Sequence, residues 1–138
     1  MKYLVFLLGF SILYAGCSSP TTPLPVLSDK FSDIQTQTFN KSCAKGGCHD
    51  ANSQQALLCL TTDSCYSQLM HHQIQAIGKK YRALVVPGFP DSSFLVYKLT
   101  TNQTTIDYGE AMPQRLNHLP QNQIDAIISW IKRGAPND

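Results

Sequence analysis

Apolar residues recur at intervals of three or four along much of this chain, and this spacing predicts amphipathic helices. The pattern is clearest near the C-terminus, where four isoleucines fall on one face of a helix that opens at Pro120. Gly134 suits the position just after the end of this helix, and Pro136 prevents its continuation. Trp130 lies beside the isoleucine face, so we expect it to anchor the core.

Three earlier segments carry shorter versions of the same pattern. We expect a first helix from an N-cap at Ser28 or Asp29 to the loop that begins at Cys43, with phenylalanine and isoleucine on its inner face. We expect a second helix over residues 62–77 and a third over 92–99. The chain shows neither an alternating strand pattern nor an internal repeat, so the predicted fold class is all-α.

The N-terminus has the order of features typical of a secretory signal peptide. Lys2 precedes an apolar run of about a dozen residues, too short for a transmembrane helix of about 20. The run ends at Ala15-Gly16-Cys17, which resembles a bacterial lipoprotein box. We therefore expect residues 1–16 to be a signal peptide and Cys17 to be lipidated. Ordinary cleavage nearby, with Cys17 lost or left unmodified, is the alternative.

The mature chain divides into a tether and one small domain. Residues 17–28 are rich in Ser, Thr and Pro and predict a flexible tether, and residues 29–138 form the domain. Without Lys2, ten basic residues face nine acidic ones, a balance that gives no footprint for nucleic acid. Membrane contact is therefore expected through the lipid. The expected location is the bacterial cell envelope, with the outer membrane favoured because Ser18 rather than Asp follows the cysteine, and with the domain in the periplasm or at the cell surface.

A short loop in the domain combines two cysteines with a histidine. Cys-x-x-Cys-His is the sequence pattern of covalent c-type haem attachment, and Cys43, Cys48 and His49 form a variant with four residues between the cysteines. Gly46 and Gly47 lie in that interval and accept φ > 0 at little steric cost. A bulge there still allows both sulfurs and the imidazole to face one macrocycle.

Other interpretations of the cysteines stay open at this point. An exported chain meets an oxidising compartment, where Cys43 and Cys48 can pair as a plain disulfide. A zinc site needs about four ligands and can be assembled only with Cys59 and Cys65. Attachment of Cys43 and Cys48 to haem, with a Cys59–Cys65 disulfide, is one arrangement that uses every thiol. Without haem, the four cysteines allow three connectivities.

Further motifs follow in an order that resembles a known family. The chain resembles the monohaem cytochrome c-like domains of bacterial lipoproteins over about residues 31–135. The motifs that carry this resemblance are Lys41-Ser42-Cys43, Gly47-Cys48-His49, the Pro-Gly-x-Pro-x-x-Ser-x-Leu-x-x-Lys-Leu segment over 87–99, Met112-Pro113, and the Ile-x-x-Ile-x-x-Trp-Ile-x-x-Gly-Ala segment over 124–135.

The resemblance implies one covalent haem c and a role for each motif residue. Cys43 and Cys48 would form the thioethers, His49 would be the proximal iron ligand and Met112 the distal ligand. A thioether with an imidazole is a known axial pair that raises the haem potential. Rivals for the sixth position are His71, His72 and His118, whereas a buried methionine that only fills the core is the alternative for Met112.

The implied function is one-electron transfer to and from redox partner proteins of the cell envelope, by a carrier rather than an enzyme. The sequence shows no Ser-His-Asp or paired-carboxylate arrangement. Two other functions stay open. One is a haem-free, disulfide-stapled lipoprotein that acts as a binding module. The other is a haem-containing subunit of a larger oxidoreductase or a peroxidase, which would need an open distal site.

Overall fold

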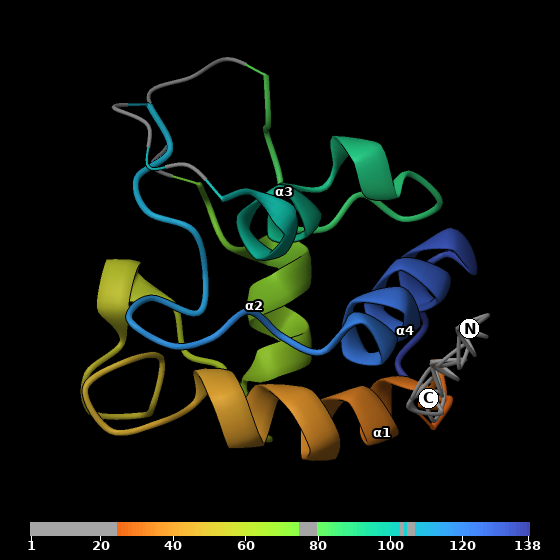
Figure 1. Ribbon diagram of the computed structural model, residues 1–138, viewed down its shortest axis with the longest axis horizontal. Coiled ribbons are helices and arrows are strands. Elements are labelled where there is room, and N and C mark those ends of the chain that lie inside the picture. Colours follow the sequence, from red (N-terminus) through yellow and green to blue (C-terminus); the bar gives the residue numbers. More distant parts are fainter. Residues whose placement is uncertain (1–24, 75–79, 103, 105–106) are drawn as a thin grey trace, which may run out of the picture.

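The computed structural model describes residues 25–74, 80–102, 104 and 107–138, and it confirms the all-α prediction for this part of the chain (Figure 1). Residues 1–24, including Cys17 and the expected signal peptide, lie outside the described residues. Among the described residues, no helix has the length and apolar character needed to cross a bilayer. The α-helices are α1 (Phe31–Ile34), α2 (Cys65–His71), α3 (Phe94–Thr100) and α4 (Gln121–Lys132).

The first helix is longer than α1 alone, because it continues as the π-helix η1 (Gln35–Cys43). Its inward residues form one stripe at helical spacing: Phe31, Ile34, Gln35, Thr38 and Phe39. The helix ends where the Ala44 N–H donates to the Phe39 carbonyl at 2.8 Å, five residues back along the chain. As the sequence predicts, this helix leads directly into the cysteine-containing loop.

The start of this helix corrects the expected cap. Neither Ser28 nor Asp29 caps it; Lys30 precedes its first turn and makes no side-chain capping bond. The distant C-terminal residue takes this role, since the Phe31 N–H donates to Asp138 Oδ1 at 2.9 Å. The Ser32 N–H donates to the Asp138 main-chain oxygen at 2.8 Å. The helix N-terminus is therefore satisfied by the other end of the chain.

The C-terminal helix α4 matches the prediction closely and contacts both α1 and α3. Trp130 is fully buried, as expected, and its ring centroid lies 5.2 Å from that of Phe31. The Trp130 indole N–H donates to the Pro136 carbonyl at 2.8 Å. Gly134 ends the helix with φ +95°, a conformation that favours glycine.

Each of the two middle helices differs from the prediction in its own way. Helix α2 begins at Cys65 rather than near residue 62, and it ends at His71 because the backbone of His72 is extended. The predicted continuation of this helix is therefore wrong for residues 72–74, and residues 75–77 lie outside the described residues. Helix α3 follows a 3₁₀ turn, Pro90–Ser92. The buried hydroxyl of Ser93, which precedes α3, accepts from the Val86 N–H and donates to the Phe89 carbonyl. These bonds hold the turn over residues 86–89 against the start of α3.

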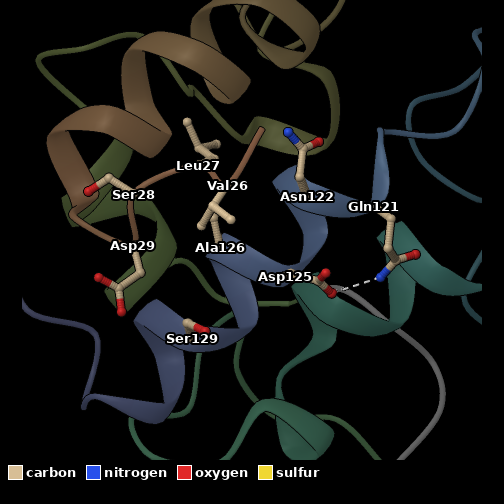
Figure 2. Close-up of a pocket in the computed structure, with 9 residues that line it drawn as sticks. All are labelled: Val26, Leu27, Ser28, Asp29, Gln121, Asn122, Asp125, Ala126 and Ser129. Carbon is tan, nitrogen blue, oxygen red and sulfur yellow. Dashed lines mark hydrogen bonds between the residues drawn. The ribbon is translucent and has the colours of Figure 1, made fainter. Parts of the chain in front are cut away.

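The last residues of the expected tether lie along α4. Asn122 donates through its side-chain amide to the Pro25 carbonyl at 2.7 Å, and Leu27 packs against the hydrophobic core. A hollow of about 560 Å³ lies between this segment and α4. Figure 2 shows the residues that line it. Residues at the end of the expected tether therefore contact the domain.

Candidate functional site

The backbone of the cysteine-containing loop folds back on itself. The His49 N–H donates to the Cys43 carbonyl at 3.1 Å, and the Cys48 N–H donates to the Lys45 carbonyl at 2.9 Å. Gly47 has φ +82°, so the bulge between the cysteines uses the conformation that glycine tolerates. The structure thus brings Cys43, Cys48 and His49 together on one loop at the end of the first helix.

The segment around residue 59 runs beside this loop and fixes it. The Gln55 N–H donates to the Cys48 carbonyl at 2.9 Å, and the Leu60 N–H donates to the His49 carbonyl at 2.8 Å. The segment is itself tied to the first helix, where the buried Gln35 amide donates to the Leu60 carbonyl at 3.1 Å. The position of the loop therefore depends on two neighbouring elements.

The half-buried His49 imidazole is oriented by the same segment. Its Nδ1 lies 3.2 Å from the Leu58 carbonyl oxygen. A carbonyl oxygen only accepts hydrogen bonds, so Nδ1 carries a proton in this contact. Histidines that ligate metals typically donate their other ring N–H to such a partner. The Leu58 carbonyl therefore orients the His49 ring as such a partner orients a metal ligand.

The four cysteines of the domain are free thiols with different environments. Burial raises the pKa of Cys43 to about 12, and the neighbouring Cys48 adds to this shift. Burial also raises the pKa of the fully buried Cys65, with Cys43 and Cys59 contributing. Ionisation of Cys48 would therefore disfavour ionisation of Cys43, and ionisation of Cys43 would disfavour that of Cys65. The sequence did not indicate the second of these interactions.

The pKa of Cys59 is shifted in the opposite direction from those of Cys43 and Cys65. The Thr61 hydroxyl, 3.3 Å from the Cys59 sulfur, lowers the pKa of this thiol. No S–S bond joins Cys59 to Cys65 in the structure, so that pairing stays a prediction. Across the described part of the chain, no three Cys, His, Asp or Glu side chains gather as metal ligands, and the four-ligand zinc alternative does not fit these residues.

Met112 lies in the segment between α3 and α4. It is half-buried against the same hydrophobic core that Cys43 contacts, and its N–H donates to the Lys98 carbonyl at 2.8 Å. The Met112–Pro113 peptide bond is cis. Within the described ranges, no hydrogen bond links Met112 to the Cys43–His49 loop. Met112 and Cys43 are connected through their packing against the same hydrophobic core.

The rival histidines lie elsewhere. His71 and His118 are exposed, and His72 is half-buried at the end of α2. His71 and His72 line a separate hollow of about 350 Å³ beside Leu57. Neither this hollow nor the larger one in Figure 2 is lined by Cys43, Cys48, His49 or Met112.

The structure also places polar groups that the sequence pattern did not reveal. Gln35 and Thr38 are buried on the inner face of the first helix, and the Gln35 Oε1 and Thr38 Oγ1 atoms have no hydrogen-bond partner. Lys98 reaches from α3 to the segment that precedes Met112. Its position within a motif of the resemblance is the only sequence signal that could have drawn attention to it.

Comparison of the chain with protein-family models, with curated proteins and with solved structures found no match.

Proposed function

We propose that this chain is a c-type cytochrome of the bacterial cell envelope, which binds one haem through Cys43 and Cys48 and transfers single electrons. The observation that carries the proposal is the orientation of His49. Its Nδ1 lies within hydrogen-bond distance of the Leu58 carbonyl, which would leave Nε2 to bind a metal, and the free thiols of Cys43 and Cys48 belong to the same loop.

The residues on the loop fit covalent attachment of this group. Cys43 and Cys48 would supply the two sulfurs, and neither belongs to a disulfide in the structure. In each thioether the thiol sulfur would bond to one vinyl carbon of the haem and the thiol hydrogen to the other, with no leaving group and no net oxidation. His49, adjacent to Cys48, would hold the iron on the proximal side.

Met112 and the core would set the properties of the bound group. When bound, the haem would supply a one-electron couple, and Met112 as a thioether ligand would raise its potential. Met112 is half-buried against the core, and Phe39 on the helix that leads to Cys43 is fully buried. These apolar residues keep water from the interior of the domain. A lipid on Cys17 would hold the carrier at the membrane, where redox partner proteins of the envelope can reach it.

The experiment that tests this proposal is mass spectrometry of the chain produced in a bacterial host with c-type haem maturation. We expect the peptide with Cys43 and Cys48 to carry the mass of one haem after acid–acetone extraction. Cys43→Ala together with Cys48→Ala should abolish the adduct, and the control Cys59→Ala should retain it. A colourless chain with Cys43 bridged to Cys48 would contradict the proposal and leave the disulfide-stapled binding module.

A further inference from the structure

Lys98 extends its side chain from α3 to the segment that precedes Met112. Its Nζ donates to the Tyr108 carbonyl at 2.8 Å and also to the Glu110 carbonyl. Gly109, between these two residues, has φ +68°, and a Cβ added there would lie 3.9 Å from Nζ. The backbone of residues 108–110 therefore curves closely around the ammonium group.

The main chain of Lys98 holds the same segment at a second point. Its carbonyl accepts the Met112 N–H at 2.8 Å. One residue thus fixes the segment on both sides, with its side chain at residues 108 and 110 and its backbone at residue 112. A hydrogen bond from a charged donor is stronger than a neutral one, so the side-chain contacts are the firmer of the two.

Aromatic side chains cluster around the Lys98 side chain where it reaches this segment. The ammonium lies 5.8 Å from the centroid of Phe94, which is one turn earlier on α3. The Tyr108 ring contacts Phe94 and Tyr97, with centroids 5.6 and 5.1 Å apart, and Tyr81 completes the cluster. Residue 108 is therefore held to α3 by its ring as well as by its carbonyl.

We propose that Lys98 is a positioning residue that fixes the segment over 108–112 and so determines how firmly Met112 is presented to a metal. The anchoring of the segment stands on the contacts above. The effect on ligation rests on the proposed function. The Glu110 carboxylate accepts from the Gln114 side-chain amide, so the carboxylate and the carbonyl of Glu110 have different partners.

The first test uses the full chain and an arginine-specific protease. Arg115 is exposed just beyond Met112, whereas Arg82 and Arg133 lie in other parts of the fold. Lys98→Met keeps a side chain of similar length but removes the donors. We expect cleavage after Arg115 to become about tenfold faster relative to cleavage after Arg82, because the segment opens without its anchor. Lys132→Met, which removes an exposed lysine from α4, should change nothing.

Two results of this test would overturn the proposal. One is an unchanged rate at Arg115 in the Lys98→Met variant. The other is an equal rise at Arg82, Arg115 and Arg133, which would show that Lys98 stabilises the whole domain rather than this segment. Lys98→Arg keeps a charged donor and should restore slower cleavage at Arg115.

The second readout is the absorption spectrum of Lys98→Leu, which removes the ammonium donors without adding a second thioether. Thioether ligation of ferric haem gives a weak far-red band. We expect Lys98→Leu to weaken or lose this band while the covalent haem remains. An unchanged band would overturn the part of the proposal that concerns the ligand. A colourless wild type would refute the proposed function instead, and the Arg115 cleavage would still decide whether Lys98 anchors the segment.

Discussion

At the scale of single residues, the two cysteines of the loop have different surroundings although they are only five positions apart. Cys43 ends the first helix and packs against the core, whereas Cys48 follows the glycine bulge. Burial favours the neutral thiol of Cys43, so little thiolate is present at neutral pH. This difference has a direct chemical consequence when no haem is attached.

In reduced chain made without haem maturation, we expect iodoacetamide to modify Cys43 slowly. The rate should rise about tenfold per pH unit towards pH 12, because the thiolate fraction follows a pKa of about 12. The measurement is peptide mass spectrometry after timed alkylation between pH 7 and 11. Free cysteine, whose rate levels off above its pKa of about 8.5, is the control. If the alkylation rate of Cys43 also levelled off above about pH 8.5, the thiol would not be buried.

At the scale of helices, a group of polar contacts, here called the polar latch, joins the start of the first helix to the last residues of the chain. Arg133 contacts Asp29 at 3.0 Å and Asp138 at 3.1 Å, and Asp138 caps the first helix through the Phe31 N–H. The Phe31 N–H, and then Arg133, hold the pKa of Asp138 below its usual value. These groups are partly exposed, so the ion pairs alone contribute little.

The latch predicts a pH dependence. Because the pKa of Asp138 is lower in the folded state, its contribution is present above the unfolded pKa of about 3.9 and is lost as pH falls through the folded value. Urea unfolding between pH 7 and 2.5 should show Asp138→Asn to be slightly less stable at pH 7. The difference from wild type should shrink below about pH 4. A constant difference over this range would exclude the carboxylate as its source.

The contact between α1 and α4 predicts a larger effect. Trp130→Phe leaves a gap in the core and removes the hydrogen bond to the Pro136 carbonyl. We expect a loss of about 2–4 kcal/mol in the free energy of unfolding. Circular dichroism during urea unfolding is the suitable probe, since Trp130 is the only tryptophan. The exposed neighbour gives a control, Ser129→Ala, expected within about 0.5 kcal/mol of wild type.

The helices differ in how well the sequence predicted them, and the reasons are physical. Helix α4 carries its own start, apolar face and glycine stop, so local rules were sufficient. The first helix is capped by Asp138, more than 100 residues away, which no local pattern reveals. Ile74 packs against the core although His72 has already left the helix, so its apolar spacing predicted too long an α2.

At the scale of the whole molecule, the sequence predicted an all-α domain and a loop that gathers Cys43, Cys48 and His49. The parts it missed depend on segments that meet only in the folded chain. The Leu58 carbonyl orients His49, and Lys98 holds the segment before Met112. Backbone carbonyls carry no sequence signal, so these supports were found only in the structure.

The most direct test of the central claim is the absorption spectrum of the mature domain, oxidised and reduced, from a host with c-type haem maturation. We predict a Soret band that survives acid–acetone extraction, sharp α and β bands on reduction, and the far-red band of Met112 ligation on oxidation. Covalent haem without the far-red band would point to another sixth ligand or an open iron. A colourless protein would contradict the account.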